Sequence, residues 1–284
     1  DLNDVATGID IRNSRLLSLL FETGLLPTAY FRAQVDTAAL TQMAPGDTRF
    51  VTLTGDFSLH GMRQTVTAEV LIARTSANDL SVSTVQPIHI DSKQFDMAGG
   101  IEALRTVANL SSIGEVVPVY FNLHYQANAD TSVQPVDMPV APQDPTNLTG
   151  TFSAATAQAN LDWQDNSANE TLFLVRRKPV VTDGYWQTVS ELTANTTRLT
   201  QALPETGEYD YKVIALNQGV PSLPTNTERV TVTEGNQVAR GEHLYQQDCA
   251  GCHGVEGEGV SGAPALNSVR DLETMITYIM DLMP

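Results

Sequence analysis

Apolar and polar residues alternate over three long stretches in the first half of the chain, residues 48–61, 64–74 and 116–128. A period of two places successive side chains on opposite faces of a strand. The stretches therefore predict antiparallel strands with one apolar face each. Turn signals at residues 54–56 and 60–62 favour a barrel or a curved sheet. The apolar residues that share a face are Val51, Leu53, Phe57 and Leu59; Val66, Ala68, Val70 and Ile72; and Val117, Val119, Phe121, Leu123 and Tyr125.

Two other segments of this half have a different pattern, which is typical of helical or irregular structure. They are residues 11–22 and residues 99–110. In the second segment the apolar residues recur at helical spacing, which places them on one side of a helix. These residues are Ile101, Leu104, Val107 and Ala108.

The second half contains shorter alternating runs, separated by Gly, Pro, Asn and Asp. A spacing of about ten residues between runs predicts a β-sandwich. Leu161 and Trp163 share one face of an early strand, and Tyr209, Tyr211, Val213 and Ala215 alternate with polar residues in a later one. The six runs are residues 157–165, 171–179, 185–192, 196–203, 209–217 and 228–234.

Composition is that of a globular protein, with 42% hydrophobic and 17% charged residues. The apolar runs are too short to span a bilayer, so no transmembrane segment is expected. The net charge of −17 is spread along the chain. This acidity argues against nucleic acid and anionic membranes as partners. The first ten residues have no basic region followed by an apolar core, as a secretory signal would, and a mature or cut chain would look the same.

The only two cysteines stand together in the motif Cys249-Ala-Gly-Cys252-His253. A Cys-x-x-Cys pair is compatible with a redox dithiol, half of a zinc site or haem attachment. Zinc requires four ligands, and only His243 is nearby as a further one. A redox dithiol of the thioredoxin type requires a strand followed by a helix, which this segment lacks. The histidine that follows the pair favours haem attachment, in which both thiols add to vinyl groups and the imidazole lies beneath the iron.

Residues 236–284, with the string GEHLYQQDCAGCHGVEGEG and the later APAL, resemble the class I cytochrome c family. The resemblance implies haem c bound covalently at Cys249 and Cys252, His253 as the proximal iron ligand, and one-electron transfer. It also implies a small α-helical domain with a methionine as the distal ligand. Where the family continues into a last helix the sequence stops at Pro284, so a domain lacking that helix is expected.

Three methionines near the end are candidates for the distal ligand. Met275 lies on the apolar face of an expected helix that starts near Asp271, which favours a place in the core. Met280 is ambiguous. Met283 precedes Pro284 and so matches the Met-Pro pattern of the family, which makes it the expected distal ligand.

Residues 145–234 resemble a fibronectin type III domain. The resemblance is carried by the string LPETGEYDYKVIALN, in which Leu203, Pro204 and Tyr209 correspond to the tyrosine corner of that family. Trp163 corresponds to its early core tryptophan. Because no row of surface aromatic residues or ligand cluster is visible, the resemblance implies a spacer or adhesive module. Trp186 is a candidate surface aromatic, although its position favours the strand on which it lies.

The first part of the chain resembles the YceI-like family. The matching strings are GIDIRNSRLLSLLFETGLLPTAYFRAQVD, LTGDFSLHGMRQTVTAEVLI and IHIDSKQFDMAGGIEALR, followed by a closing strand. The resemblance implies a lipocalin-like antiparallel barrel whose lumen holds a polyisoprenoid, in some members a quinone tail. The family has one or two further strands before GIDIR, so an incomplete barrel is expected. Arg12, Arg105 and His124 are candidates to contact a polar head group, and the lumen could instead be filled by side chains.

Together these readings predict a mostly β chain with four parts. The parts are a YceI-like barrel over residues 1–128, a Pro-rich linker over 129–144, a fibronectin type III sandwich over 145–234 and a cytochrome c-like haem domain over 236–284.

The organisation favours an exported electron carrier rather than an enzyme. Electrons would pass from an isoprenoid quinone in the barrel to haem c and then to an external redox partner, such as a secreted oxidase that acts on polysaccharide. Haem attachment implies a periplasmic or cell-surface location. The alternative is a lipid-binding or adhesion protein in which the haem serves as a redox or gas sensor. A peroxidase would require a distal acid–base residue, and the sequence indicates none.

Overall fold

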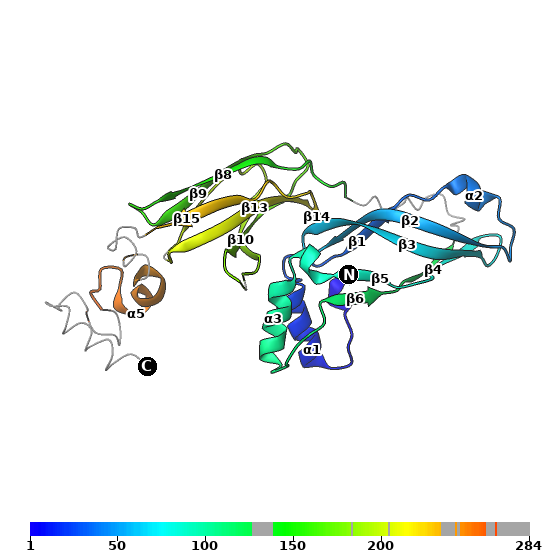
Figure 1. The fold of residues 1–284 in the computed structure, drawn as a ribbon, viewed down its shortest axis with the longest axis horizontal. Helices are drawn as coiled ribbons and strands as arrows, with labels where there is room; N and C mark the ends of the chain where they lie inside the picture. Colours follow the sequence, from blue (N-terminus) through cyan, green and yellow to red (C-terminus); the bar gives the residue numbers. More distant parts are fainter. Residues whose placement is uncertain are drawn as a thin grey trace. The chain divides into compact units, whose positions relative to one another are not determined.

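The computed structural model describes residues 1–126, 139–182, 184–203, 205–233, 242, 245–259 and 265. Figure 1 labels the helices and strands of the fold. The chain divides into two compact units. The first contains Asp1–Thr149, Asp162–Thr197 and Asp210–Glu228, and the second contains Gly150–Leu161, Arg198–Tyr209 and Arg229–Pro284. As predicted, the fold is mostly β, with an antiparallel half-barrel sheet, sandwich sheets and a small helical segment around the cysteines. The domain boundaries drawn from the sequence remain a prediction.

The half-barrel is a five-stranded antiparallel sheet in the order β1-β2-β3-β4-β7. Its longest strands, β2 and β3, pair along their whole length from Thr48↔Ala73 to Leu59↔Met62. His60 and Gly61 connect them with φ of 51° and 70°, the left-handed pair that a tight two-residue hairpin requires. The strands are β1 (Tyr30–Ala33), β2 (Thr48–Leu59), β3 (Met62–Arg74), β4 (Asp79–Thr84) and β7 (Asn122–Gln126).

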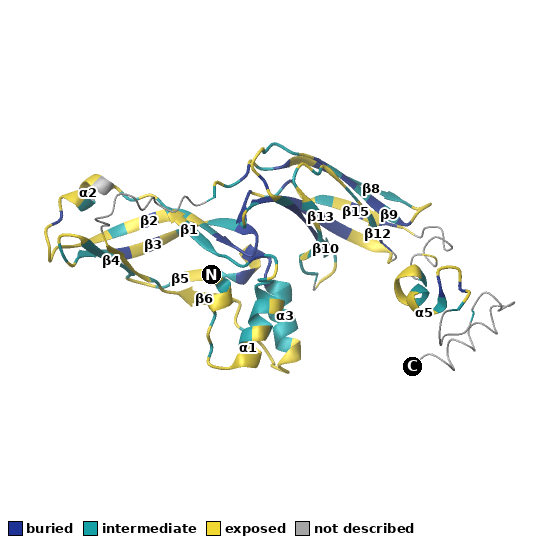
Figure 2. Ribbon diagram, turned by 180° about the vertical axis from the view of Figure 1, so that it is seen from behind, coloured by how far each residue is buried: buried dark blue, intermediate teal, exposed yellow. Residues whose placement is uncertain are grey.

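The alternation in the sequence correctly predicts which face of this sheet is buried. Leu53 and Ala68 face each other in the β2–β3 register and are 7% and 3% exposed. Their neighbours Thr52 and Thr67 are exposed on the opposite face. Figure 2 shows this difference as alternating colours along β2 and β3. The apolar faces therefore line the concave side of one sheet.

The turn expected at residues 54–56 is wrong, because these residues lie within β2. Gly55 is opposite Ala33 of β1, and a Cβ added at Gly55 would lie 2.7 Å from the Cβ of Ala33. The glycine permits β1 to approach β2 closely and does not turn the chain.

The stretch expected as one strand over residues 116–128 is divided into two. β6 (Val116–Val119) pairs with β5 (Ile88–Asp91), whereas β7 pairs with β4. Between them the amide of Phe121 donates to the hydroxyl of Thr84 at 3.2 Å, and the amide of Thr84 donates to the carbonyl of Phe121 at 3.1 Å. The chain thus passes from the sheet of β5 to the sheet of β4, while Val119, Phe121 and Leu123 all continue to face the same side.

Helices form in the segments where helical or irregular structure was expected. Residues 11–22 contain most of α1 (Asp10–Arg15) and the π-helical turn η2 (Leu16–Leu20), and residues 99–110 contain most of α3 (Ala98–Val107). α3 packs on η2, and a Cβ added at Gly100 would meet the carbonyl oxygen of Leu19. Further short elements are η1 (Leu2–Asp4), α2 (Thr37–Thr41) and η3 (Ser92–Phe95).

The later strands form the two sheets of a β-sandwich. One sheet has the order β11-β10-β13-β14 with β15 paired to β13, and the other has the order β12-β9-β8. Trp163 of β9 packs on Phe173 of β10 with ring centroids 6.0 Å apart, as expected for a core tryptophan. The strands are β8 (Thr146–Ser153), β9 (Gln158–Gln164), β10 (Leu172–Pro179), β11 (Gln187–Thr193), β12 (Arg198–Ala202), β13 (Gly207–Asn217), β14 (Val220–Pro221) and β15 (Glu228–Val232).

Strand β13 is buried on both faces, although alternation in the sequence predicts one polar face. Lys212 is only 6% exposed. Ile214 and Leu216 lie in the same core cluster as Leu59 and Phe95, within the first unit. The even-numbered residues of β13 from Asp210 to Leu216 are therefore core residues of this unit.

A buried cluster of charges accompanies this core. The guanidinium of Arg176 donates to Asp96 at 2.7 Å and to the carbonyl oxygen of His60 at 2.6 Å. The ammonium of Lys212 lies 2.6 Å from the same Asp96 carboxylate and 4.2 Å from the ring centroid of Trp186. Burial lowers the pKa of Lys212, and the charge of Asp96 opposes this effect. Trp186 thus lies against a cation.

The described end of the expected linker, residues 139–144, is held by hydrogen bonds. The carbonyl oxygen of Val140 accepts hydrogen bonds from the side-chain amide nitrogens of Asn169 and Asn217, both at 3.0 Å. The Asp144 carboxylate accepts from the amide of Leu223 at 2.7 Å. These residues form part of the first unit. No helix of the described residues has the length and apolar character needed to cross a membrane.

Candidate functional site

The concave face of the half-barrel encloses a cavity of about 650 Å³. This volume lies within the usual range of small-molecule sites. Its walls come from β1, β2, β3, β4, β6 and β7, together with the chain around α2. The lining residues are Ala29, Phe31, Ala33, Val35, Leu40, Leu53, Phe57, Ile72, Leu80, Val82, Val119, Phe121, Leu123 and Tyr125.

The lining of this barrel cavity is apolar, and the Tyr125 phenol is its one side-chain polar group. Phe31 and Phe121 pack at a centroid distance of 6.3 Å, so aromatic rings form part of the wall. Leu123 and Tyr125 are 42% and 54% exposed, which marks the β7 side as open to solvent. An uncharged cavity of this kind favours a hydrocarbon chain, because burial of apolar surface is its main source of affinity.

The residues expected at a polar head group lie outside this lining. His124 points away from the cavity, 64% exposed, with its Nε2 3.8 Å from Asp79. Arg105 is on α3, where it donates to Glu102 and to the carbonyl oxygen of Leu110. Arg12 is on α1 and lines a different cavity. A head-group role for these three residues remains a prediction.

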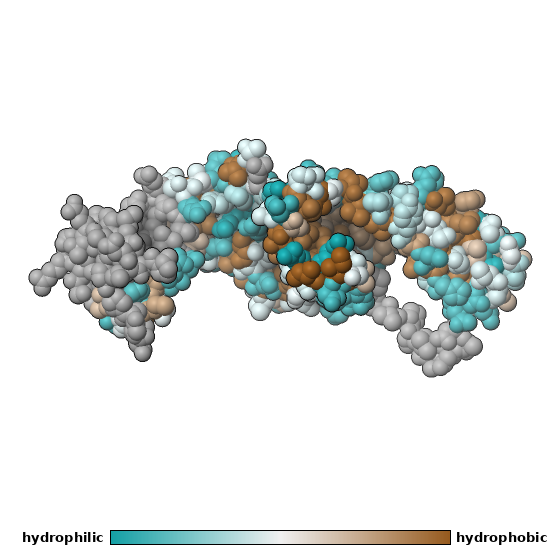
Figure 3. All heavy atoms as spheres, turned by 90° about the horizontal axis from the view of Figure 1, so that it is seen from below, coloured by the Kyte–Doolittle hydropathy of each residue, from teal (hydrophilic) through white to brown (hydrophobic). Residues whose placement is uncertain are grey.

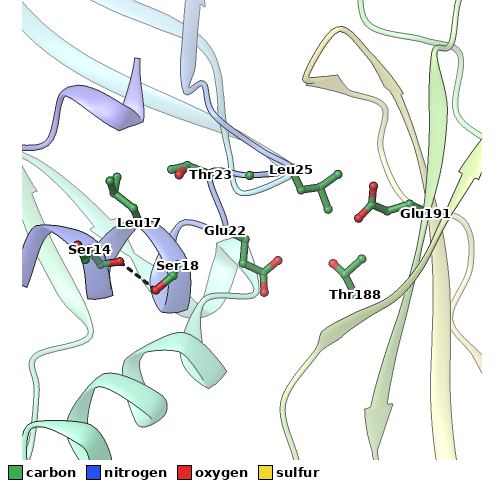
Figure 4. A pocket seen from close by; sticks show the side chains of 9 residues that line it. Ser14, Leu17, Ser18, Glu22, Thr23, Leu25, Thr188 and Glu191 are labelled. Atoms are coloured by element: carbon green, nitrogen blue, oxygen red, sulfur yellow. Dashed lines mark hydrogen bonds between the residues drawn. The ribbon is translucent and has the colours of Figure 1, made fainter. Parts of the chain in front are cut away.

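A third cavity, with a volume of about 720 Å³, is lined by Ser, Thr and Glu side chains together with Leu17 and Leu25 (Figure 4). Ser18 donates to the carbonyl oxygen of Ser14 at 2.9 Å on one side. Glu22 accepts a hydrogen bond from His60, which lowers the pKa of its carboxyl group against the opposing effect of burial. This contact is 3.4 Å long. Since Glu22 is already held by His60, the cavity offers no free acid–base pair among the residues shown.

The cysteine motif begins at the end of a π-helical turn, η4 (Tyr245–Cys249), and continues in α5 (Ala250–His253). Cys249 and Cys252 are free thiols, half-buried and exposed respectively. Their spacing of three residues places both on the same side of a helical turn. A Cβ added at Gly251, between them, would meet no atom within 4 Å. The turn is therefore open at Gly251 and Cys252, where a bulky flat group can approach.

Hydrogen bonds hold the chain that follows His253. The Tyr245 phenol donates to the carbonyl oxygen of Gly254 at 2.6 Å, and loss of hydration raises the pKa of this phenol, which favours the donor form. The amide of Gly259 donates to the carbonyl oxygen of His253 at 2.7 Å. Gly254 has a φ of 82°, and an added Cβ would collide with the Glu258 carboxylate. This return loop keeps the half-buried His253 next to the thiols.

The donor set fits haem c. Haem c requires two thiols for its thioether bonds and an imidazole next to them as an axial ligand, and these three groups are present in the motif. Among the residues that the structure describes, no group of three or more His, Cys, Asp or Glu side chains is placed to hold a metal ion. The candidates His243, Met275, Met280 and Met283 lie outside the described residues.

Comparison with known families finds one match for the part of the chain that holds the barrel cavity and one for the part that holds the cysteine motif. Residues 1–125 match the family model of the YceI-like domain. Residues 238–279 match the family model of cytochrome c. The resemblances of residues 1–125 to the YceI-like domain and of residues 238–279 to cytochrome c are thereby confirmed. A comparison with curated proteins gives no match.

Solved structures are similar to separate parts of the chain. A polyisoprenoid-binding domain from Saccharophagus degradans, implicated in plant cell wall breakdown, is 37% identical, with 45% of this chain and 74% of that chain covered and a TM-score of 0.44. A fibronectin type III-like protein from Clostridium thermocellum is 22% identical, with 34% of this chain and 100% of that chain covered and a TM-score of 0.28. A pectate lyase from Pectobacterium carotovorum is 20% identical, with 31% and 27% covered and a TM-score of 0.26.

The residues assigned to a fibronectin type III domain are placed as follows. Leu203 is 2% exposed and its amide donates to the carbonyl oxygen of Ala157 at 2.9 Å. Tyr209 is also buried, and Pro204 lies outside the described residues. The assignment to that family remains a proposal.

Sequence reasoning missed two features of the YceI-like part of the chain. One is the buried carboxylate of Asp96, and the other is a second apolar cavity that Arg15 lines together with Arg12. Helical spacing of Ile101 and Leu104 on α3 is a signal for the second cavity, but its other wall comes from α1 and η2, some 90 residues earlier.

Proposed function

We propose that this chain is an electron carrier that takes electrons from an isoprenoid quinol in the barrel cavity and passes them through haem c to an external redox partner. The proposal rests on one observation, namely that an uncharged apolar cavity and a haem-attachment motif occur in the same chain. Oxidation of a quinol releases two electrons and two protons. The electrons would leave one at a time, and the protons would go to water.

The residues have separate roles in this proposal. The apolar walls of the barrel cavity would hold the isoprenoid tail and exclude water from it. Cys249 and Cys252 would hold haem c, with His253 as the proximal and Met283 as the distal iron ligand. Haem supplies a one-electron couple whose potential is set by its axial ligands and burial.

The middle part of the chain would act as a fibronectin type III spacer. Because c-type haem is attached outside the cytoplasm, a periplasmic or cell-surface location belongs to the same proposal. A secreted oxidase that acts on polysaccharide is the proposed class of redox partner.

A cavity-filling substitution tests the quinol step. The full chain is prepared with haem in a host that attaches c-type haem, and reduction of the haem by a quinol with a short isoprenoid tail is followed by anaerobic stopped-flow absorbance. Ala33→Trp fills the lined space and is expected to slow reduction by about tenfold or more, because the tail loses its apolar site. Gln34→Trp, an exposed neighbour, is the matched control and should leave the rate unchanged.

Reduction by dithionite should be equally fast in all three proteins, because it does not use the cavity. Reduction of wild type and Ala33→Trp at the same rate by the quinol would contradict the proposal. Absence of haem reduction by quinol, together with retained isoprenoid binding, would instead favour the lipid-binding protein with a haem sensor.

A further inference from the structure

A second cavity of about 430 Å³ lies between the helices of the YceI-like domain. It is formed by α1 and η2 on one side and by α3 and the chain leading into β6 on the other. It shares no lining residue with the barrel cavity. The lining residues are Ile9, Ile11, Arg12, Arg15, Leu16, Leu20, Ile101, Leu104, Ala108, Leu110, Ile113, Gly114 and Val117.

The charges of this helical cavity are all positive. Arg12 and Arg15 are its only charged lining residues, and no carboxylate is among them. Neither guanidinium forms an ion pair or side-chain hydrogen bond with the residues that the structure describes. Arg105 on α3 differs, because its guanidinium is held by Glu102 at 2.7 Å and 2.5 Å. In a chain with a net charge of −17, two unpaired cations beside an apolar cavity favour an anion.

The mouth of the helical cavity is apolar and open to solvent. Ile9, Ile11, Leu110 and Val117 are 45%, 60%, 47% and 51% exposed. Figure 3 views this side of the molecule, and hydrophobic residues gather near its centre together with hydrophilic ones. Exposed apolar residues that converge on a cavity commonly mark a ligand site.

We propose that the helical cavity binds a long-chain carboxylate, with the alkyl chain among the apolar side chains of α1, η2 and α3 and the carboxylate on Arg12 and Arg15. A guanidinium binds a carboxylate through two parallel hydrogen bonds, which gives both affinity and orientation. The barrel cavity offers no such cation among its lining residues. The two cavities therefore select lipids by the charge of the head group.

The test compares amphiphiles of one chain length and opposite charge on the full, haem-loaded chain. Binding of laurate and of dodecyltrimethylammonium, below their micelle concentrations, is measured by calorimetry. Wild type is expected to bind laurate at least about tenfold more tightly than dodecyltrimethylammonium, because only the carboxylate can pair with the guanidinium groups. Arg12→Gln combined with Arg15→Gln should remove this preference. The affinity for laurate should fall by about tenfold, and the affinity for the cationic amphiphile should not fall. Equal affinities in wild type, or laurate affinity unchanged in the double variant, would overturn the proposal.

A second pair of variants tests the cavity independently of charge. Ala108→Trp fills the helical cavity and should weaken the binding of laurate. Thr106→Trp, on the exposed side of α3, should leave laurate binding unchanged. Unfolding curves of all variants are recorded to check that each variant keeps the fold. Equal laurate binding by Ala108→Trp and Thr106→Trp would overturn the proposal.

Two further outcomes identify other occupants. If a neutral polyprenol displaces laurate, or Ala33→Trp abolishes its binding, laurate occupies the barrel cavity and the proposal is wrong. If the wild type binds phosphatidylglycerol vesicles through Arg12 and Arg15 but does not bind laurate, the surface docks on membranes and the proposal is equally wrong. Laurate binding that persists with polyprenol bound supports two independent sites, whether or not the quinol step occurs.

Discussion

Asp96 supplies the negative charge for two buried cations. Its side chain is 5% exposed, those of Arg176 and Lys212 are 1% and 7% exposed, and both cations contact the same carboxylate oxygen. Burying a charge is costly unless it is paired, so removal of one partner costs more than the pair itself contributes. The carboxylate of Asp96 therefore determines whether this part of the core is stable.

Asp96→Asn is expected to lower the free energy of unfolding by about 3–5 kcal/mol, because it leaves two cations buried without a counter-charge. Urea unfolding followed by tryptophan fluorescence measures the loss, since Trp186 lies against Lys212. Asp56→Asn, at an exposed carboxylate of β2, should change stability by less than about 0.5 kcal/mol. Equal stability of the two variants would show that Asp96 does not stabilise the unit through its charge.

This cluster could not be predicted from the sequence. Asp96 and Arg176 are 80 residues apart, and charged residues in alternating strands usually face solvent. The period of two in β13 correctly gives the side on which each residue lies. Alternation cannot show that other residues of the same unit cover the face of β13 that carries Lys212, because this burial depends on contacts between segments distant in the sequence.

The contact between Glu22 and His60 predicts a dependence on pH. Because the pKa of Glu22 is lowered in the folded protein, its ionised form stabilises the fold at pH values above the unfolded pKa of roughly 4.3. This contribution is lost as the pH falls through the lower folded pKa. Glu22→Gln should therefore be less stable than wild type near pH 5, and the difference should shrink toward pH 3.

Unfolding curves recorded from pH 5 to pH 3 measure this difference. The effect should be small, because the Glu22 side chain is 39% exposed and partly screened by water. Glu69→Gln, on the exposed face of β3, serves as the control. A gap between wild type and Glu22→Gln that does not vary with pH would contradict the assigned contact.

At the scale of elements, close approach of two segments is set by glycine. α3 lies against η2 at Gly100, where an added Cβ would lie 2.9 Å from the Cα of Leu20 and would also meet the Leu19 carbonyl oxygen. Both atoms belong to the backbone and cannot rotate away. The separation of α3 from η2, and hence the shape of the helical cavity, depends on this position.

Gly100→Ala is expected to destabilise the domain by up to about 2 kcal/mol. Alanine in a helix is favoured over glycine by about 1 kcal/mol, but overpacking against backbone costs about 1–3 kcal/mol and moves the helix. Gly114→Ala is the matched control, because a Cβ there meets no atom within 4 Å. Thermal unfolding compares the two, and a Gly100→Ala protein as stable as the control would show that α3 is free to shift.

The faces of β2 and β3 follow from the sequence because alternation is a local property of a strand. Leu53 and Val70 are buried as their positions predict. The division of residues 116–126 into β6 and β7 does not follow, since the apolar face continues through Phe121 while the pairing partner changes from β5 to β4. Pairing depends on the rest of the sheet, which a single segment does not encode.

At the scale of the whole molecule, the two thiols would fix the cofactor to the chain. Single Cys249→Ala and Cys252→Ala variants are expected to retain haem through one thioether bond, in reduced yield. The double variant should carry no covalent haem. Haem staining after denaturing electrophoresis and the Soret absorbance measure the difference.

Gly251→Ala is the control for this experiment. It adds a methyl group into open space between the thiols and should leave haem content unchanged. Covalent haem in the double variant would disprove attachment at this motif. The haem-attachment motif is visible in the sequence because its groups are adjacent, whereas the cavities depend on surfaces assembled from distant residues.

Strand β1 is much shorter than β2, and this difference leaves part of β2 as an exposed sheet edge. β1 pairs with β2 only from Gly55 to Ser58, so among the described strands Thr48–Thr54 of β2 have a neighbour on one side, β3. Their outer amides and carbonyls are free to form a ladder with a foreign strand. Concentrated samples are therefore prone to intermolecular strand pairing there, and a short extended peptide matched to this register would act as a solubilising cap.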